Sequence, residues 1–331
     1  MLSHNQIFDI FNKELDKLYD KSSDVAIQLQ SSNLYEPVKY ALQQGGKRIR
    51  PIMLLLSCEA CGGNIIDAIY PAIGLEIFHN FTLVHDDIMD NASVRRGKPT
   101  VCNKWNNNIA ILSGDTLFAL AIKFVTMTRD ELIKPILEQF CKTSIEVCEG
   151  QQFDMDFETM PNISIYEYIE MIRLKTAVMF ASALKIGAMI AGKPLKTQEA
   201  LYKYGEFVGL AFQIMDDYLD VYGDSNVFGK KTGGDIICCK KSYLYLKAME
   251  VADDEMKLHL RTIYEDTNID PAKKVKTVVD IFNILNVKEI AIEAISCNKK
   301  RAQECLDSAE LDTQSKKVIE DYCNELFVRE S

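Results

Sequence analysis

Apolar residues recur along most of this chain every three or four positions, the spacing at which side chains share one face of an α-helix. No convincing run of alternating apolar and polar residues, the pattern of a β-strand, interrupts them. Glycine, proline and asparagine clusters break the helical pattern. These breaks lie at residues 43–51, 61–64, 91–100, 160–164, 191–196, 221–235 and 266–274. The pattern therefore predicts an all-α protein.

The positions of the breaks also bear on domain organisation. All sixteen glycines precede Asp235, and no proline occurs between Pro194 and Pro271, so the last third is expected to form long helices. None of the breaks is a long polar linker, and there is no low-complexity segment or short-period repeat. We therefore expect a single domain spanning residues 1–331.

Composition narrows the class of protein. The 331 residues are 47% hydrophobic, enough to bury a sizeable core, and the formal charge is −10. An acidic chain is a poor match for a general nucleic-acid or anionic-membrane surface, although a local basic pocket remains compatible with it. The first residues predict an amphipathic helix rather than a secretion signal, and no apolar run reaches membrane-spanning length. We therefore expect no transmembrane segment and a cytoplasmic location.

The cysteines agree with that location. Ten cysteines without a signal peptide are typical of reduced thiols in a cytosol. Cys58 and Cys61 form a C-x-x-C, a spacing that also occurs in zinc and redox sites. Their helical context and the lack of a second such pair favour buried core cysteines instead.

Two aspartate clusters carry the most specific chemistry. They are Asp86, Asp87 and Asp90 in "DDIMD", and Asp216, Asp217 and Asp220 in "DDYLD". Residues four apart share a helix face, so like charges there repel unless something neutralises them. Oxygen-only ligands select hard cations such as Mg2+, and a helical bundle could bring the two clusters face to face across a cavity. A solvated helix end is the alternative for either cluster taken alone.

Basic loops follow both clusters. Arg95, Arg96 and Lys98 follow the first, and Lys230 and Lys231 follow the second. Carboxylate, metal, phosphate, and then arginine or lysine is the order of charges expected in a diphosphate site. The sequence thus predicts that Mg2+ and a diphosphate lie between the acidic and basic groups.

A third basic group precedes both clusters. In "QQGGKRIRP", Lys47, Arg48 and Arg50 stand at the start of a predicted helix, where backbone amides and cations together favour an anion. His79 lies two helical turns before Asp86 on the same side, which makes it a partner for a second anion, with a core histidine as the alternative. His85 is not expected to bind metal, because an all-oxygen Mg2+ site has little use for imidazole.

Taken together, these motifs make the chain resemble a known protein family. "GGKRIRP", "HNFTLVHDDIMD" with "RRGKPT", "EGQQFDMD", "RLKTA", and "FQIMDDYLDVYGD" with "FGKKTGGD" and "KKSY" occur in the order typical of one family. The chain resembles a trans-isoprenyl diphosphate synthase of the polyprenyl synthetase family, of the short-chain farnesyl/geranylgeranyl type, over nearly its whole length. This resemblance implies a single-domain, isoprenoid-synthase-type helical bundle around a deep central cavity, and a homodimer.

The resemblance also implies two substrate pockets. The positions that hold the diphosphate of isopentenyl diphosphate are Lys47, Arg50, His79 and Arg96. The positions that hold the allylic diphosphate are Arg95, Lys175, Thr176, Gln213, Lys230 and Lys240. The main Mg2+ ligands are Asp86, Asp90 and Asp216, supported by Asp87, Asp217 and Asp220. Gln151 and Asp154 match a pair near the reacting carbons, and whether Lys240 or Lys241 reaches phosphate stays open.

The implied reaction explains these charges. An allylic C–O bond ionises, and three Mg2+ ions with cationic side chains, Arg95 and Lys175 among them, stabilise the departing diphosphate. The carbocation is kept from water in an apolar cavity, where aromatic faces can stabilise it. The double bond of isopentenyl diphosphate then attacks, and a proton leaves, with the departed diphosphate as a reasonable base.

Product length is expected to depend on the helix before the first cluster. In the resembled family, bulk at the fifth and fourth residues before the first aspartate stops elongation. Here these residues are Phe81, which is large, and Thr82, which is small. Phe78 lies on the same wall as Thr82, and the alternative is that Phe78 and Phe81 only pack the core. Without the two-residue insertion of many bacterial short-chain relatives, the motif favours a product of fifteen to twenty carbons, with twenty preferred.

Several other functions fit the motifs less well. A class I terpene cyclase would replace the second cluster with an Asn/Asp, Ser, Glu pattern and would not need "GGKRIRP". A squalene- or phytoene-synthase-like enzyme would carry looser D-x-x-x-D clusters. A longer-chain polyprenyl synthase remains an alternative, as does a non-catalytic subunit of a two-component synthase, although such a subunit would be expected to have lost aspartates or the basic pocket.

Overall fold

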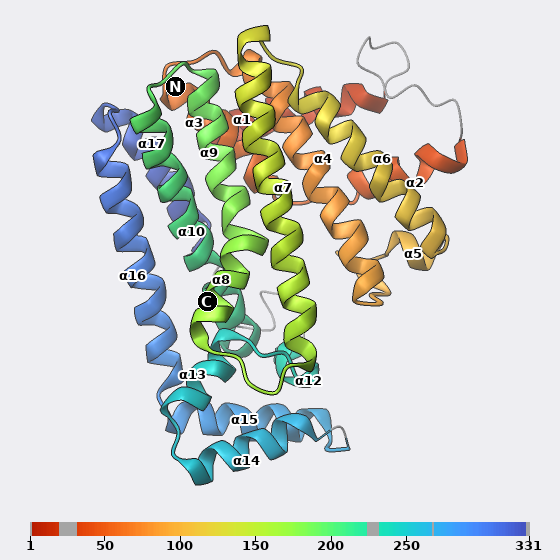
Figure 1. The fold of residues 1–331 in the computed structure, drawn as a ribbon, viewed down its shortest axis with the longest axis vertical. Coiled ribbons are helices and arrows are strands. Elements are labelled where there is room, and N and C mark those ends of the chain that lie inside the picture. The colour runs from red at the N-terminus through yellow and green to blue at the C-terminus, as the bar shows by residue number, and fades with distance from the viewer. Residues whose placement is uncertain (1, 20–31, 224–231, 267, 329–331) are drawn as a thin grey trace. The chain divides into compact units, whose positions relative to one another are not determined.

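The computed structural model describes residues 2–19, 32–223, 232–266 and 268–328 of the chain, and these are mostly helical (Figure 1). The all-α prediction is therefore confirmed. The elements up to residue 125 are α1 His4–Asp16, the 3-10 helix η1 Lys17–Tyr19, α2 Ser32–Leu42, α3 Ile49–Ala60, α4 Ile65–Met89, β1 Val94–Arg95, β2 Lys98–Pro99, α5 Val101–Lys104 and α6 Asn107–Val125.

The later elements begin at residue 130. They are α7 Asp130–Thr159, α8 Ile165–Ile172, the π-helix η2 Arg173–Ala177, α9 Val178–Ile190, α10 Leu195–Tyr222, α12 Gly234–Ile237, α13 Tyr243–Val251, α14 Asp254–Glu265, α15 Pro271–Ile284, α16 Val287–Ser308 and α17 Thr313–Glu325. The predicted breaks at 43–51, 61–64, 91–100, 160–164, 191–196 and 266–274 all coincide with the ends of helices.

The chain forms two compact units. The first comprises Met1–Cys141, Ala183–Gln198 and Leu311–Ile319, and the second comprises Lys142–Ser182, Glu199–Glu310 and Glu320–Ser331. Each unit is described by itself below. The single domain spanning residues 1–331 stays a prediction.

Helix α4 is the centre of the first unit. Asn64 caps its start by accepting a hydrogen bond from the Ile66 amide, and α4 packs along α6 and α3 (Figure 1). A β-carbon at Gly74 would lie 2.5 Å from Val125 Cγ2 and 2.6 Å from the Val125 amide nitrogen, so only glycine allows this approach. The close packing holds rigidly the helix face that leads to the first aspartate cluster.

Helix α6 is, by length and composition alone, long and apolar enough to cross a membrane, with a mean hydropathy of 1.5 over Asn107–Val125. It is the one such helix among the residues that the structure describes. The sequence shows no uninterrupted apolar run there, because Asp115 and Lys123 lie within it. Core helices pass the same test, and α6 packs along α4.

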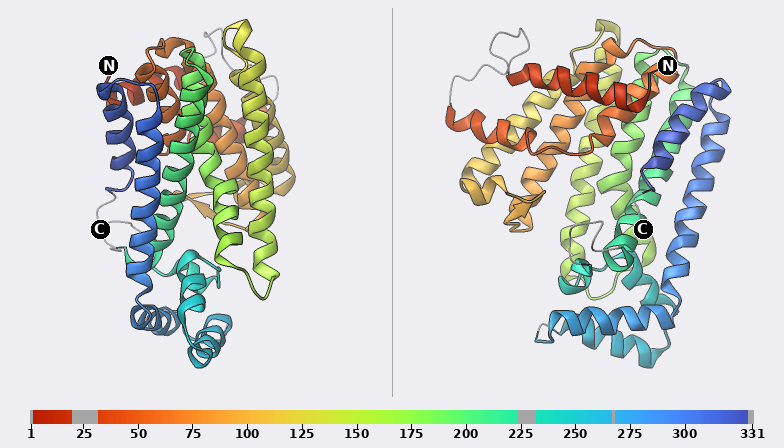
Figure 2. Two further views of the ribbon diagram at one scale, coloured as in Figure 1. Left: turned by 60° about the vertical axis from the view of Figure 1, so that its left-hand side comes forward. Right: turned by 180° about the vertical axis from the view of Figure 1, so that it is seen from behind.

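The second unit is built around aromatic and aliphatic residues of α8, α10 and the later helices. Tyr243, Tyr264, Phe282 and Ala291 belong to one buried apolar cluster. Tyr245 and Tyr264 bring their rings to 4.2 Å between centroids. Helices α14 and α15 lie side by side, as Figures 1 and 2 show from three directions. This core supports the helix ends that carry the second aspartate cluster.

The last third departs from the prediction of long helices. Among the helices described there, α16 with 22 residues is the one long helix, whereas α13 has 9, α14 has 12 and α15 has 14. The chain turns without glycine, at Cys239 with φ 56° and at Asn286 with φ 54°. Asp253 caps α14 by accepting a hydrogen bond from the Met256 amide. Left-handed residues and caps therefore end helices that the glycine and proline pattern left continuous.

A short hairpin also departs from the expectation that no strand occurs. Val94 pairs with Pro99 and Arg95 with Lys98, in antiparallel register. The two tip residues both have positive φ, 52° at Arg96 and 73° at Gly97, as a tight primed turn requires. Strands of two residues are too short to show an alternating pattern.

The C-x-x-C pair lies in the core, as predicted. Cys58 and Cys61 are buried, and no cysteine of the chain forms a disulfide. Burial raises the pKa of the Cys58 thiol to about 12 and that of Cys61 to about 11. Thiols that hold their protons so tightly are poor nucleophiles and poor metal ligands.

Candidate functional site

The first unit contains a basic pocket of about 400 Å³, within the size range of small-ligand sites. Four of its residues are those predicted to bind one diphosphate, namely Lys47, Arg50, His79 and Arg96. The other lining residues are Gly46, Arg48, Ile49 and Glu76. Residues from the start of α3, the middle of α4 and the hairpin tip thus meet at one place, although they are far apart in the sequence.

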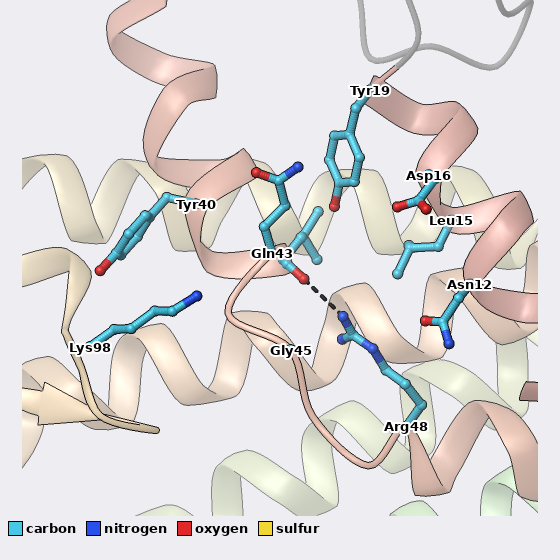
Figure 3. Close-up of a pocket in the computed structure, with 10 residues that line it drawn as sticks. Asn12, Leu15, Asp16, Tyr19, Tyr40, Gln43, Gly45, Arg48 and Lys98 are labelled. Carbon is cyan, nitrogen blue, oxygen red and sulfur yellow. Dashed lines mark hydrogen bonds between the residues drawn. The ribbon is translucent and has the colours of Figure 1, made fainter. Parts of the chain in front are cut away.

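Arg48, which the sequence grouped with Lys47 and Arg50 as a cation of an anion site, is instead paired within the protein. It is 7% exposed, has φ 49°, and precedes the first turn of α3. Its guanidinium lies 2.5 Å from Glu76 Oε1 and donates to the Leu42 carbonyl at 2.9 Å, a bond drawn in Figure 3. Asn80 also donates to Glu76 Oε1, at 3.2 Å. This buried ion pair holds the loop in the left-handed turn that leads into the pocket.

A second pocket, drawn in Figure 3, is also lined by residues of this loop, Gly45 and Arg48. Asn12, Asp16 and Tyr19 line it from α1 and η1, Tyr40 from α2, and Lys98 from the hairpin. Arg48 lines both pockets. Lys98, which the sequence grouped with Arg95 and Arg96, therefore faces this second pocket.

The glycine pair in "QQGGKRIRP" makes room for Arg96. Gly46 has φ 140°, and a β-carbon there would lie 2.8 Å from Arg96 Nη1. Arg96 donates from Nη1 to the Gly45 carbonyl. Glycine at position 46 thus suits both a positive φ that other residues rarely adopt and the close approach of Arg96 to the loop.

His79 is a neutral partner of Arg50. Burial lowers the pKa of His79 well below 6.5, and the neighbouring Arg50, Arg96, Arg95 and Arg48 lower it further. Its Nε2 lies 3.2 Å from Arg50 Nη1, so the unprotonated nitrogen accepts from the guanidinium. The imidazole thus orients Arg50 and contributes no positive charge of its own to the pocket.

The first aspartate cluster divides its side chains between two directions. The Asp90 amide donates to the Asp86 carbonyl at 2.8 Å, so Asp86 and Asp90 share one helix face. Asp87 is instead buried, 3% exposed, and its Oδ1 lies 2.7 Å from Arg95 Nε. Burial raises the pKa of Asp87, while Arg95 opposes that rise. Arg95, predicted to bind the allylic diphosphate, is therefore also the partner of Asp87.

The second cluster repeats this division. Asp217 is 5% exposed and accepts hydrogen bonds from the Tyr168 hydroxyl, from the Tyr243 amide at 2.8 Å and from Gln213 Nε2 at 3.3 Å. Burial and then Asp235 raise the pKa of Asp217 to about 7. In both motifs the second aspartate is thus directed to the protein interior, a difference in role that the sequence pattern does not reveal.

Asp220 and Asp235 lie together beyond Asp216. Asp220 Oδ2 accepts from the Asp235 amide at 2.9 Å, in the first turn of α12. Burial and then the nearby carboxylate of Asp220 raise the pKa of Asp235 to about 6, while Lys240 opposes that rise. Sequence reasoning quoted "FGKKTGGD" without assigning Asp235. Its position directly after two glycines, in a motif that follows the second aspartate cluster, could have indicated that it belongs to the site.

The residues of "RLKTA" lie in the π-helix η2, Arg173–Ala177. Lys175 Nζ donates to Asp154 Oδ2 at 2.5 Å, and Thr176 Oγ1 donates to Gln213 Oε1 at 3.1 Å. Gln213 in turn donates to Asp217, so Thr176 and Gln213 are linked to the second aspartate cluster, whereas Lys175 is paired with Asp154. Gln151 is buried, and among the described residues its Oε1 has no hydrogen-bond partner.

The two lysines before α13 differ in their contacts. Lys241 Nζ donates to the Phe157 carbonyl at 2.6 Å and to the Met160 carbonyl, which ties it to the end of α7. Lys240 is exposed, and its amide donates to the Asp235 carbonyl at 2.9 Å. This arrangement favours Lys240 as the phosphate-facing residue. The predicted Lys230, together with Lys231, lies outside the described residues.

The donor set suits a hard cation with several open positions. Within the described part of the chain, no three His, Cys, Asp or Glu side chains gather closely enough to form a closed metal site. Asp86 and Asp90 offer oxygen ligands from one face, and Mg2+ takes one or two carboxylates while keeping water or phosphate oxygens. Asp86 and Asp216 belong to different units, so the meeting of the two clusters stays a prediction.

An aromatic cluster lies on α4 before the aspartates. Phe78 is fully buried, with its ring centroid 5.2 Å from that of Phe140, which agrees with the alternative that it packs the core. Phe81 is half-buried and contacts Phe118 at 5.2 Å and His85 at 4.8 Å between ring centroids. Thr82 Oγ1 donates to the His79 carbonyl at 2.8 Å. Phe118, on α6, is a neighbour of Phe81 that sequence reasoning missed.

Comparison with known proteins identifies relatives over most of the chain. The polyprenyl synthetase family profile matches residues 31–282. The geranylgeranyl diphosphate synthase of Methanosarcina mazei is 36% identical over 305 residues, which are 89% of this chain and 93% of that protein.

Solved structures agree in fold. A geranylgeranyl pyrophosphate synthase superposes with a TM-score of 0.93 and 39% identity, and the match covers 100% of both chains. A polyprenyl synthase from Caulobacter crescentus CB15, complexed with calcium and isoprenyl diphosphate, has a TM-score of 0.82 and 26% identity, over 99% of this chain and 97% of that one.

We expect substitution of one partner of the Arg48–Glu76 pair to destabilise the fold strongly. Arg48→Met leaves the buried Glu76 carboxylate without its cation and should lower the free energy of unfolding by about 3–5 kcal/mol. The Arg48→Met/Glu76→Leu double variant should recover most of that loss, because no charge stays buried. Urea unfolding measures both, with Lys47→Met at the exposed neighbouring position as control. A single variant as stable as the wild type would contradict the role of the pair.

His79 predicts a pH dependence of stability. Because its folded pKa lies below the unfolded 6.5, the unfolded chain binds more protons below pH 6.5, and stability falls as pH falls. The loss is up to about 1.4 kcal/mol per pH unit until the folded pKa is reached. Melting temperatures at pH 7.5, 6.5 and 5.5 should fall more steeply for wild type than for His79→Gln. Parallel pH profiles would show that folding does not lower the pKa of His79, and would contradict its neutral role.

Proposed function

The chain belongs to the polyprenyl synthetase family, and we propose that it joins isopentenyl diphosphate to an allylic diphosphate, giving geranylgeranyl or farnesyl diphosphate. It is a prenyltransferase of isoprenyl diphosphate synthesis. The reaction is a head-to-tail condensation by ionisation, condensation and elimination.

The observation that carries this proposal is the basic pocket of the first unit. Lys47, Arg50 and Arg96 line it with cationic side chains, and His79 holds Arg50 by a hydrogen bond. Several cationic donors around a pocket of this size suit a diphosphate, which carries more charge than one arginine can neutralise. We assign this pocket to the diphosphate of isopentenyl diphosphate.

The allylic diphosphate is assigned to the second unit together with Arg95. Lys175, Thr176, Gln213 and Lys240 would hold it, with Lys230 as a further predicted ligand outside the described residues. Lys175 already faces a carboxylate at 2.5 Å, so a bound diphosphate competes with Asp154 for its ammonium. Arg95 and Lys175 would stabilise the negative charge that develops as the allylic C–O bond breaks.

The family is Mg2+-dependent, and the carboxylate faces of this chain fit such a cation. We propose Asp86, Asp90 and Asp216 as its ligands, with three ions in each active site. When bound, the ions draw charge from the departing diphosphate. Asp87 and Asp217 support the ligands from inside, by fixing the helix turns on which Asp86 and Asp216 lie.

A product of twenty carbons is the preferred length. Phe81 is the large, half-buried side chain one turn before the first aspartates, and its contacts with Phe118 and His85 hold its ring in place. Thr82, beside it, is small and leaves room. Phe78 is fully buried beside Phe140 and would limit length only indirectly.

The family also suggests how the chain assembles. We propose a homodimer, supported by the exposed apolar side chains Ile111 and Leu112 on α6, which a second copy would cover. Light scattering of the purified protein at the mass of one chain would contradict it. The cytoplasmic location stays an expectation from the sequence.

The two roles of the aspartates predict opposite phenotypes. Asp86→Ala or Asp216→Ala should lower turnover by orders of magnitude and leave the melting temperature nearly unchanged, because each removes a metal ligand rather than an interior contact. Asp217→Ala should lower the melting temperature, since it removes the acceptor of three hydrogen bonds, two of them from buried donors. Steady-state kinetics with excess Mg2+ and thermal unfolding separate the two. Near-normal turnover of Asp86→Ala would refute the metal assignment.

A product assay tests the function and its length together. Purified protein is incubated with Mg2+, labelled isopentenyl diphosphate and, separately, dimethylallyl, geranyl or farnesyl diphosphate, and the dephosphorylated alcohols are sized by chromatography. A series that stops at fifteen or twenty carbons is expected, and Phe81→Ala should lengthen it. An unchanged product length in Phe81→Ala would show that Phe81 only packs the core and does not limit the product. Absence of condensation with every primer would instead favour a partner-dependent subunit.

A further inference from the structure

The turn that carries Lys175 and Thr176 is not an ordinary helical turn. Residues Arg173–Ala177 form a π-helix between α8 and α9, with one residue more per turn than an α-helix. Such turns are rare and often occur at functional sites. Here the two neighbouring side chains contact different helices, Lys175 reaching Asp154 on α7 and Thr176 reaching Gln213 on α10.

Two glycines make space for the wide turn. A β-carbon at Gly150, on α7, would lie 2.4 Å from the Lys175 amide nitrogen and 2.8 Å from the Leu174 carbonyl carbon. A β-carbon at Gly209, on α10, would lie 2.5 Å from Ala177 Cα. The atoms met are mostly backbone atoms of the turn, so they cannot move aside unless the turn itself shifts. The wide turn is thus held from two sides without side chains between.

One arginine secures the start of the turn. Arg173 donates to both oxygens of Glu170, from Nε at 2.8 Å and from Nη2 at 2.7 Å. Its Nη1 lies 3.3 Å from Glu206 on α10 and 3.9 Å from Glu146 on α7. A planar guanidinium with several carboxylate partners has few orientations open to it. Arg173 therefore links α7, α8 and α10 at the first residue of the π-helix.

The two flanking helices present the same order of groups to the turn. On α7, Glu146, Gly150 and Asp154 follow at intervals of four residues and share one face. On α10, an acid, a glycine and an amide follow at intervals of three and four residues, as Glu206, Gly209 and Gln213. Each face thus offers an acid to Arg173, a glycine to the turn backbone, and a polar side chain to Lys175 or Thr176.

We propose that Arg173, Gly150 and Gly209 are positioning residues that keep this turn wide, so that Lys175 and Thr176 are directed to the allylic diphosphate. The inference rests on the proposed role of Lys175 and Thr176 as ligands of that diphosphate. In an α-helix each residue advances by about 100°, so loss of the extra residue would rotate one of the two side chains away from its helix. Neither glycine nor Arg173 touches substrate in this account.

Glycine substitutions with a matched control test the proposal. Gly150→Ala and Gly209→Ala should each raise the KM for the allylic diphosphate about tenfold or more and change the KM for isopentenyl diphosphate little. Gly205→Ala is the control, because its β-carbon would lie 2.7 Å from Ala181 Cα, also a contact with backbone on α10, but away from Lys175. It should lower the melting temperature to a similar extent without changing the ratio of the two KM values. Equal changes in that ratio for all three variants would overturn the proposal.

Arg173 is tested in the same way. Arg173→Met should raise the allylic KM selectively, and Arg173→Lys should restore it only in part, since a lysine cannot bind both Glu170 oxygens in parallel. Lys203→Met is the control, because Lys203 Nζ lies 2.6 Å from the same Glu206 but contacts no part of the turn in the described structure. A selective allylic effect of Lys203→Met as large as that of Arg173→Met would assign the effect to Glu206 rather than to the turn.

A double-mutant cycle separates failure of this inference from failure of the proposed function. If Gly150 acts through Lys175 and Thr176, adding Gly150→Ala to the Lys175→Ala/Thr176→Ala variant should raise the allylic KM no further. If Gly150→Ala has its full effect in that background, the positioning role is wrong while the ligand roles of Lys175 and Thr176 stand. If Lys175→Ala leaves the allylic KM unchanged, the ligand assignment itself has failed.

Discussion

The predicted site gathers aspartates in two clusters and basic residues in a pocket, and like charges so close together repel. Groups of opposite charge or hydrogen-bond donors from other parts of the fold have to balance them. Three buried or half-buried ion pairs and one set of hydrogen bonds to a buried carboxylate do this in the described structure, and each lies beside a predicted substrate or metal residue. They are Arg48–Glu76, Arg95–Asp87, Lys175–Asp154 and the hydrogen bonds from Tyr168 and Tyr243 to Asp217. Because an unpaired buried charge is far more costly than a paired one, these contacts fix the backbone that carries the site.

Neighbouring residues of the same type have different roles in this charge balance. Asp86 and Asp90 share a face suited to a cation, whereas Asp87 between them is held by Arg95. Lys240 is exposed next to Lys241, whose ammonium binds two backbone carbonyls. In each pair of neighbours, one residue is a predicted ligand of metal or phosphate and the other holds the chain in place. The helix makes this possible, since adjacent residues point about 100° apart.

Several close contacts in the fold are possible because one of the two residues is a glycine, which has no side chain. Gly46 admits Arg96 to the loop before α3, Gly74 admits α6 to α4, and Gly150 admits the π-helix to α7. In the sequence, Gly46 reads as part of a break, and Gly74 and Gly150 read as tolerated interruptions of a helix. Glycine is favoured at these three positions because each contacts a residue distant in the chain, and the local sequence pattern contains no information about that contact.

The sequence by itself determined the helical class, most of the breaks between helices, the two carboxylate faces and the family, because these follow from local spacing and from motifs in a fixed order. It also named Lys47, Arg50, His79 and Arg96, which one pocket brings together. Only the tertiary structure decided that His79 is neutral, that Arg48, Asp87 and Asp217 are directed inward, and that Lys175 lies on a π-helix. Those properties depend on burial and on partners far away in the chain, and neither can be deduced from the residues next to a position in the sequence.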